Sequence, residues 1–387
     1  MSTVAIPKEE HYARIARVQE AVRAAGLDAL LVHSHEADFA NVRYLSNYWP
    51  IFETAGVLVP AQGEAVQIIG PESETFARDR GYLAKIRRIL EYRESADPDY
   101  PGVELDTFAS IFAECGITPN RIGIAGRSLL PVTIYEALRR DAPKAELVPA
   151  DDILTNLRVI KSEAELACLR EGFRISVIAL QAVLEEIRPG LTEQQVVGIA
   201  QGAMYAAGAE YEAHPTYVLS GINSTHAIGR PSTRVLQKGD LVQLDIGARV
   251  CGYSPSVGFP VCLGKMTEEM HRLAEVCIDA HYKTMEWIRA GIPAKEPVLK
   301  FEQYVQDRGC GENLLYGPCH GLGMMEVERP WMESSSEYLL QENMTFQVDT
   351  FLQGSEFGMR YENGARVTQE GVEVLAPDLK MEIVEIE

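Results

Sequence analysis

The first part of the chain alternates one amphipathic helical pattern with short apolar runs. Residues 9–26, EEHYARIARVQEAVRAAG, place apolar side chains at helical spacing and end at Gly26, a residue type that commonly follows a helix end. Apolar runs of strand length follow in DALLVHS, AGVLVP, EAVQIIG and RIGIAG. This alternation predicts a small α/β domain over residues 8–155.

A second domain is predicted over residues 160–387. It opens with a long helical stretch, SEAELACLREGFRISVIALQAVLEEI, at the end of the charged segment LRVIKSEAE. Thr192 and Gln195 have the spacing of a capping box, in which each side chain bonds the backbone N–H of the other residue at the start of a helix. The predicted helices precede the predicted strands. This order is typical of an α+β fold with helices on one face of a mostly antiparallel sheet.

A weak internal repeat divides the second domain into two halves. IRPG at residues 187–190 returns as IRAG 101 residues later, and LVQLD, ending at Asp245, returns as TFQVD, ending at Asp349, 104 residues later. His214 and His320 lie 106 residues apart in the corresponding stretches. We therefore expect two similar halves, each with a strand that brings an aspartate to one central site.

Composition limits the partners and the compartment. The 387 residues include 56 acidic and 36 basic side chains, and the formal net charge of -20 repels phosphate backbones and anionic membranes. No apolar run approaches the roughly 20 residues of a membrane span. We expect neither nucleic acid nor a membrane as a partner. Seven scattered cysteines without CxxC spacing, and an N-terminus without a secretory signal, predict a cytoplasmic protein.

Four ordered motifs carry the chemistry of the second domain. They are KGDLVQLDIGARVCGYSPSVGFPVCLG, GPCHGLGMMEVERP, ENMTFQVDTF and GMRYENGARVTQEGVEVL. In this order and spacing they resemble the motifs of the pita-bread (peptidase M24) superfamily, which includes creatinase, aminopeptidase P and prolidase. The first domain resembles the creatinase N-terminal domain. The resemblance implies a pita-bread catalytic domain with two pseudo-symmetric halves, preceded by a creatinase-type α/β domain.

Members of that superfamily that use metal hold two divalent ions with two aspartates, a histidine and two glutamates. The resemblance assigns these roles to the residues Asp245, Ser256, His320, Asp349 and Glu362, so serine replaces an aspartate and aspartate replaces a glutamate. Three carboxylates then face the four positive charges of two ions. We therefore expect either no metal, as in creatinase, or a single divalent ion held by Asp245, His320, Asp349 and Glu362.

The proton-handling histidines of the superfamily are also displaced. Where the resemblance places one of them this chain has Ile228, with His226 two residues earlier and therefore on the same face of a strand. Where it places another, the chain has Val327, although Glu328 keeps its position. We expect Xaa-Pro dipeptides to be poor substrates for this reason. The predicted catalytic residues are His226, His320, Glu328 and Glu362.

Other residues are predicted to bind the substrate or to close its pocket. In the first domain, NVRYLSNYWP resembles a stretch in which an aromatic loop reaches over the active site of a partner subunit. This makes Tyr48 and Trp49 candidate pocket residues and implies a homodimer. Packing of both aromatic side chains within their own domain is the alternative. The predicted substrate-binding set is Asp245, Asp349, His214, Ser256, Tyr48 and Trp49.

These features lead to one leading hypothesis and two alternatives. Carboxylates without two bound cations suit a positively charged or amide-bearing molecule. We therefore predict a hydrolase that acts on a C–N bond of a small amide, amidine or cyclic nitrogen compound. The alternatives are a single-metal hydrolase or lyase, including a residual Xaa-Pro peptidase, and a non-catalytic binding scaffold.

Overall fold

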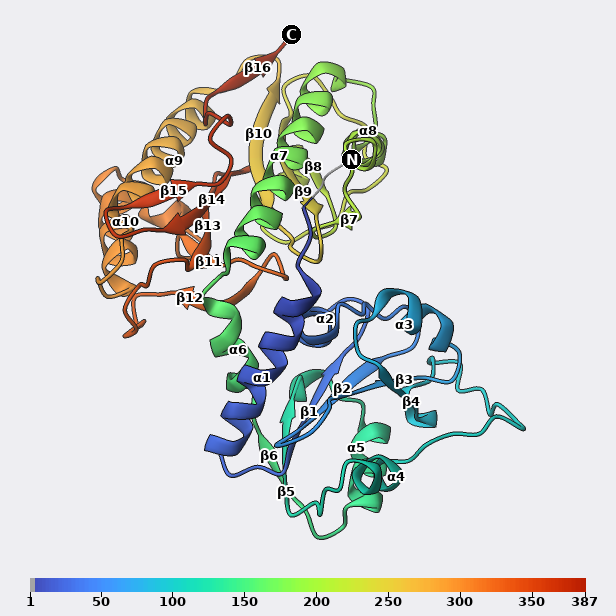
Figure 1. The fold of residues 1–387 in the computed structure, drawn as a ribbon. Helices are drawn as coiled ribbons and strands as arrows, with labels where there is room; N and C mark the ends of the chain where they lie inside the picture. Colours follow the sequence, from blue (N-terminus) through green and yellow to red (C-terminus); the bar gives the residue numbers. More distant parts are fainter. Residues whose placement is uncertain (1–3) are drawn as a thin grey trace. The chain divides into compact units, whose positions relative to one another are not determined.

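A computed structural model describes residues 4–387 as two compact units, Ile6–Arg158 and Val159–Glu387 (Figure 1). The second unit also includes the first described residues of the chain. The domains expected from the sequence cover residues 8–155 and 160–387. No helix in the described part of the chain has the length and apolar character needed to cross a membrane.

The N-terminal unit contains a six-stranded sheet with the strand order β4-β3-β2-β1-β5-β6. Strand β1 is antiparallel to β2 and parallel to β5. As the sequence predicted, the amphipathic stretch forms α1 and the four apolar runs form β1, β2, β3 and β5. The elements are α1 (Lys8–Ala24), β1 (Ala29–Ser34), α2 (Ala40–Ser46), β2 (Ala55–Pro60), β3 (Val66–Ile69), α3 (Glu74–Arg80), β4 (Lys85–Arg88), η1 (Leu90–Tyr92), α4 (Phe108–Glu114), β5 (Arg121–Ala125), η2 (Arg127–Leu129), α5 (Val132–Asp141), β6 (Glu146–Pro149) and α6 (Asp151–Val159).

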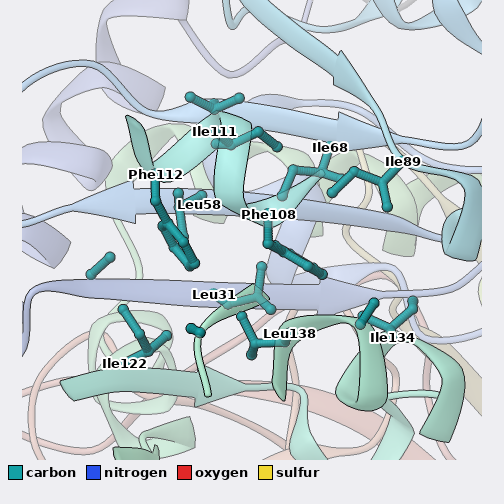
Figure 2. Packing of buried hydrophobic residues seen from close by; sticks show 14 of the residues in the cluster. Leu31, Leu58, Ile68, Ile89, Phe108, Ile111, Phe112, Ile122, Ile134 and Leu138 are labelled. Atoms are coloured by element: carbon teal, nitrogen blue, oxygen red, sulfur yellow. The ribbon is translucent and has the colours of Figure 1, made fainter. Parts of the chain in front are cut away.

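An apolar core joins this sheet to α4 and α5. Figure 2 shows Leu31 and Leu58, from neighbouring strands, in one cluster with Phe108 of α4 and Leu138 of α5. All four side chains are fully buried. Because burial of a large apolar side chain contributes roughly 1.5–3 kcal/mol, this cluster gives the N-terminal unit a core of its own.

The C-terminal unit is built on a ten-stranded sheet whose main path is β12-β11-β13-β14-β10-β9-β7. Three further strands pair with members of this path: β8 with β9, β15 with β14 and β16 with β10. The elements are α7 (Glu163–Glu186), α8 (Glu193–Ala206), β7 (Tyr211–Glu212), β8 (Tyr217–Ser220), η3 (Gly221–Thr225), β9 (Leu241–Arg249), β10 (Ser256–Leu263), α9 (Glu268–Trp287), α10 (Lys295–Asp307), η4 (Gly311–Asn313), β11 (Cys319–Gly321), β12 (Glu328–Met332), β13 (Thr345–Gln353), β14 (Gly358–Val367), β15 (Val372–Val374) and β16 (Val384–Ile386).

Two similar halves meet at the middle of this sheet, as the internal repeat predicted. In the first half β8 and β10 flank β9, and in the second half β11 and β14 flank β13, all antiparallel. The antiparallel pair β10–β14 joins the halves. Helix α7 packs against β9 and β10, while α9 packs against β13 and β14 (Figure 1). The predicted α+β arrangement with a mostly antiparallel sheet is confirmed.

Helix α8 begins with the capping box that the sequence predicted. The Thr192 side chain accepts a hydrogen bond from the backbone N–H of Gln195 at 3.1 Å, and the Gln195 side chain accepts one from the N–H of Thr192 at 2.8 Å. Both bonds satisfy N–H groups that the first turn of a helix otherwise leaves without a partner.

We predict that Thr192→Ala lowers the free energy of unfolding of the C-terminal unit by about 1 kcal/mol, because the cap oxygen is lost. Thr192→Ser is the matched control, since serine keeps that oxygen and should retain most of the stability. Urea unfolding followed by circular dichroism measures the difference. Equal transition midpoints for the alanine and wild-type proteins would contradict the prediction.

Candidate functional site

Four adjacent strands bring three of the predicted acidic residues into one row across the sheet. Asp245 of β9 pairs with Gly258 of β10, Gly258 pairs with Glu362 of β14, and Glu362 pairs with Asp349 of β13. Directly paired residues of an antiparallel sheet lie on the same face. The three carboxylates therefore share one face, and the glycine between two of them leaves room above β10.

Arg360, two residues before Glu362 on β14, fills this room. Its Nη1 donates to Asp245 Oδ2 at 2.8 Å, and its Nε lies 3.1 Å from Asp349 Oδ1. Nε is also 3.9 Å from Glu362 Oε2. A Cβ atom at position 258 would lie only 2.7 Å from the Cγ of Arg360, so Gly258 is required for the close approach of the arginine stem.

Asp245 has a second cationic partner in His214. The His214 Nε2 lies 3.2 Å from Asp245 Oδ1, the oxygen that Arg360 does not bond. Burial acts to lower the pKa of His214, but the Asp245 carboxylate outweighs it and raises the pKa to about 9. Burial acts to raise the pKa of Asp245, yet His214 and Arg360 hold it below its usual range. At neutral pH the pair is therefore an imidazolium and a carboxylate.

Asp349 is likewise held by donors of the same unit. The Tyr316 hydroxyl donates to Asp349 Oδ2 at 2.7 Å, and Arg360 Nη2 donates to that hydroxyl at 2.9 Å. Burial raises the pKa of the Asp349 carboxyl and of the Tyr316 hydroxyl. We refer to Arg360 and its partners Asp245, Asp349, His214 and Tyr316 as the Arg360 network. Within it, three of the four aspartate oxygens accept a hydrogen bond, whereas Asp349 Oδ1 has Arg360 Nε 3.1 Å away but forms no hydrogen bond.

A second group of polar side chains consists of His320, Glu326 and Glu362, which we call the histidine–glutamate cluster. One ligand atom from each lies within 4.8 Å of the other two. The His320 Nε2 is 3.5 Å from Glu326 Oε1 and 4.0 Å from Glu362 Oε1. The Ser256 hydroxyl lies 3.4 Å from Glu326 Oε1 and 3.3 Å from Glu362 Oε1. Burial and the neighbouring carboxylates raise the pKa of Glu362 well above its usual range.

The sequence patterns did not point to Glu326. The superfamily motif concerns the next two residues, Val327 and Glu328. Glu326 itself lies in the loop between β11 and β12. The sequence feature that could have indicated Glu326 is its position in GLGMMEVE, between the glycine turn and Glu328. Only the fold shows that this loop returns to the start of β10, where Ser256 lies.

Glu328, a predicted catalytic residue, has a buried partner of its own. Lys161 Nζ is 3.0 Å from Glu328 Oε1, and the two side chains are 2% and 6% exposed. A Cβ atom at Gly323 would clash with the Glu328 carboxylate, so this glycine is needed for its position. The ion pair connects the segment before α7 to β12. A catalytic role for Glu328 stays a prediction.

Three other predicted residues do not join the two groups. His226 is exposed in the turn that follows η3. In the N-terminal unit, Tyr48 is fully buried, and the Trp49 indole donates to the carbonyl oxygen of Glu36 at 2.9 Å and lies 5.1 Å from the Phe39 ring. Tyr48 and Trp49 therefore pack inside their own unit, which was the alternative to a pocket role. The binding roles of Tyr48 and Trp49 and the catalytic role of His226 stay predictions.

These contacts indicate how many divalent ions the residues can hold. Both oxygens of Asp245 and one oxygen of Asp349 accept hydrogen bonds from protein donors, the Arg360 guanidinium lies against both carboxylates, and Ser256 carries no charge. The five positions identified by resemblance therefore do not fit two ions. The histidine–glutamate cluster offers one imidazole nitrogen and two carboxylates, a donor set that fits one divalent ion.

Comparison with known proteins identifies the families that the two parts of the chain match. Residues 167–369 match metallopeptidase family M24, and residues 14–160 match the creatinase/prolidase N-terminal domain. The chain is 27% identical over 360 residues to an Xaa-Pro dipeptidase of Pyrococcus horikoshii, across 92% of this chain and 95% of that protein.

Solved structures extend the likeness to the whole chain. An Xaa-Pro dipeptidase from Bacillus anthracis has a TM-score of 0.83 at 25% identity, over 97% of this chain and 100% of its own. An X-Pro aminopeptidase from Thermotoga maritima has a TM-score of 0.84 at 21% identity, over 96% of this chain and 99% of its own, and shares the fold.

The matches confirm the expected pita-bread fold, preceded in the sequence by a creatinase-type N-terminal domain. The relatives named above are peptidases, so the small amide, amidine or cyclic nitrogen compound expected from the sequence finds no support among them. The M24 match covers just over half of the 387 residues, and the N-terminal match covers most of the rest. The chain therefore belongs to metallopeptidase family M24 and is a hydrolase that acts on C–N bonds.

Proposed function

We propose that the C-terminal unit hydrolyses the peptide bond of a short peptide at the histidine–glutamate cluster. One observation carries the proposal: a histidine nitrogen and two carboxylates converge within 4.8 Å, and the fixed Arg360 guanidinium lies beside them. Proton-transfer groups and a positive charge are what amide hydrolysis requires of an active site. The named relatives support a peptide as the substrate class, in place of a smaller nitrogen compound.

The cluster is suited to activating a water molecule. The His320 Nδ1 lies 3.2 Å from the carbonyl oxygen of Gly321, so the ring proton is assigned to Nδ1 and the Nε2 lone pair faces the glutamates. A water between them donates a proton to a carboxylate as its oxygen attacks the peptide carbon. The protonated carboxyl then gives that proton to the leaving nitrogen. The C–N bond breaks, and the products are a carboxylic acid and an amine.

Arg360 supplies a fixed positive charge next to the reacting groups. Its Nε is 3.9 Å from Glu362 Oε2, and the aspartates of the Arg360 network set its position. A cation that is in place before the reaction stabilises the negative charge that develops on the carbonyl oxygen. A divalent ion, when bound, would polarise the carbonyl and lower the pKa of water, and the histidine–glutamate cluster would hold it.

Two exposed apolar residues stand where the resemblance places histidines. Ile228 is 87% exposed and Val327 is 46% exposed. Neither side chain can donate a proton, so the leaving nitrogen depends on the histidine–glutamate cluster for its proton. We expect this chain to hydrolyse Xaa-Pro dipeptides more slowly than the relative from Bacillus anthracis does.

We predict that His320→Ala and Glu362→Gln each lower kcat/KM for dipeptides by roughly 10² to 10⁴, because the first removes the Nε2 lone pair that faces the water and the second removes a carboxyl group that can carry the proton. His271→Ala and Glu268→Gln are matched controls on the exposed surface of α9 and should retain full activity. Amine release is measured over a panel of dipeptides with and without proline, with and without added divalent metal.

The Bacillus anthracis Xaa-Pro dipeptidase serves as the positive control in the same assay. If it is active while the wild-type chain releases amine from no dipeptide under any metal condition, the proposed function is wrong. Full activity in both cluster variants would also contradict it, because the reaction would then take place elsewhere.

We also propose that the chain forms a homodimer, as expected from the aromatic stretch of the first domain. Ile51 and Phe52 directly follow that stretch and are 47% and 77% exposed. Phe52 has a backbone φ of 58°, a left-handed conformation that is rare for an aromatic residue. An exposed phenylalanine presented in this way suits contact with a second copy of the chain.

We predict that Phe52→Asn weakens the dimer, since asparagine tolerates the left-handed conformation but removes the apolar side chain. Val132→Asn, at an exposed position on α5, is the control and should leave association unchanged. Light scattering coupled to size exclusion gives the mass of each variant. A monomeric wild-type protein at micromolar concentration would contradict the prediction.

A further inference from the structure

We propose that Glu326 provides the carboxylate that position 256 lacks, so that His320, Glu326 and Glu362 form a site for one divalent transition-metal ion. The inference rests on the proposed function in one respect, because it assigns the ion to the site where hydrolysis is proposed. It is otherwise an argument about ligand atoms, and it is carried by three independent features of the site.

The first feature is the place that the Glu326 carboxylate occupies. Its Oε1 lies 3.4 Å from the Ser256 hydroxyl, which is itself 3.3 Å from Glu362 Oε1. The hydroxyl also accepts a hydrogen bond from Gln347 Nε2 at 2.8 Å. Ser256 therefore contributes hydrogen bonds but no charge, and the Glu326 carboxylate, from another segment, is its neighbour. A carboxylate on residue 256 itself would extend into the same space.

The second feature is the anchoring of the loop that carries Glu326. The backbone N–H of Ser254 donates to Gly323 O at 2.9 Å, and the Ser254 hydroxyl donates to Met324 O at 2.8 Å. Leu322 N–H donates to Thr345 O at 3.1 Å. These bonds tie the loop both to the segment before β10 and to β13. The position of Glu326 is therefore set by the fold, as metal binding requires of a ligand.

The third feature is the spacing of the ligand atoms, which converge but lie too far apart for good hydrogen bonds. With its proton on Nδ1, His320 presents an Nε2 lone pair toward carboxylate oxygens 3.5 Å and 4.0 Å away. His320 is 5% exposed and Glu362 is 1% exposed. Acceptors that face one another away from water are unfavourable unless a cation or a proton lies between them. One imidazole and two carboxylates neutralise a divalent ion, and this donor set suits Zn²⁺ or Co²⁺.

The Arg360 network explains why the site takes one ion and not two. Its guanidinium already lies between Asp245 and Asp349, at 2.8 Å and 3.1 Å from their oxygens. The remaining oxygens of these aspartates lie against His214 and Tyr316. A second ion would have to displace these donors, whereas an ion at the histidine–glutamate cluster displaces none of them.

The test moves the carboxylate from residue 326 to residue 256 and measures metal binding in the absence of substrate. The full chain is freed of metal by dialysis against a chelator, and Zn²⁺ binding is measured by calorimetry and Co²⁺ binding by its visible spectrum. We expect one ion per chain. Glu326→Gln should weaken binding by more than the roughly 10- to 100-fold that the loss of an outer hydrogen-bond partner costs. The double variant Ser256→Asp, Glu326→Gln should recover most of that loss, because it returns a carboxylate to the same space.

Glu333→Gln, at an exposed position after β12, is the control and should bind like the wild type. Ser256→Asp alone is a second test that does not depend on the folding of the Glu326 variant. It should bind the ion at least as tightly as the wild type. The inference is overturned if the wild type binds no ion or two ions, if Glu326→Gln binds unchanged, or if the double variant of Ser256 and Glu326 folds but recovers nothing. A chain that passes this test yet hydrolyses no peptide would refute the proposed function alone. Hydrolysis with unchanged binding in Glu326→Gln would refute this inference alone.

Discussion

The guanidinium of Arg360, buried among carboxylates of three strands, is the interaction on which the catalytic unit depends. Asp245 and Asp349 come from opposite halves of the sheet, and Arg360 is the cation that lies against both carboxylates. Removing one partner of a buried ion pair costs several kcal/mol, because the other charge remains buried. Arg360 therefore links the halves electrostatically where β10 and β14 link them by backbone hydrogen bonds. The absence of a side chain at Gly258 is what admits it.

This arrangement separates the polar face of the sheet into two parts with different properties. In the Arg360 network three of the four aspartate oxygens accept hydrogen bonds and the guanidinium lies against both carboxylates, so this part has little capacity for a new ligand. In the histidine–glutamate cluster the ligand atoms lie 3.5 Å and 4.0 Å apart, too far for good hydrogen bonds and close enough for shared coordination. The first part is held by contacts within the protein, and the second part is where we propose that the reaction takes place.

Much of the fold and part of this site could be predicted from the sequence, because both depend on patterns within single segments. The repeat that ends at Asp245 and Asp349 reflects two strands that occupy equivalent places in the sheet. The capping box at Thr192 was predictable for the same reason, since its partners lie three residues apart. Neither Arg360 nor Glu326 could be assigned in this way. Arg360 meets Asp245 across 115 residues and Glu326 meets Ser256 across 70 residues, and only the strand order shows that these pairs meet.

The charges of the two groups explain why the change at position 256 need not abolish an active site. The Arg360 network and the histidine–glutamate cluster together contain four carboxylates: those of Asp245, Asp349, Glu326 and Glu362. Two fixed cations, Arg360 and the protonated His214, offset two of them. The remaining two negative charges lie at the histidine–glutamate cluster, and a buried excess of this kind favours the uptake of a proton or a cation. Burial first, and the neighbouring carboxylates second, raise the pKa of Glu362. Serine at position 256 thus removes one carboxylate from β10 while Glu326 places one beside it from the loop, and the cluster keeps the negative charge that the proposed metal binding requires.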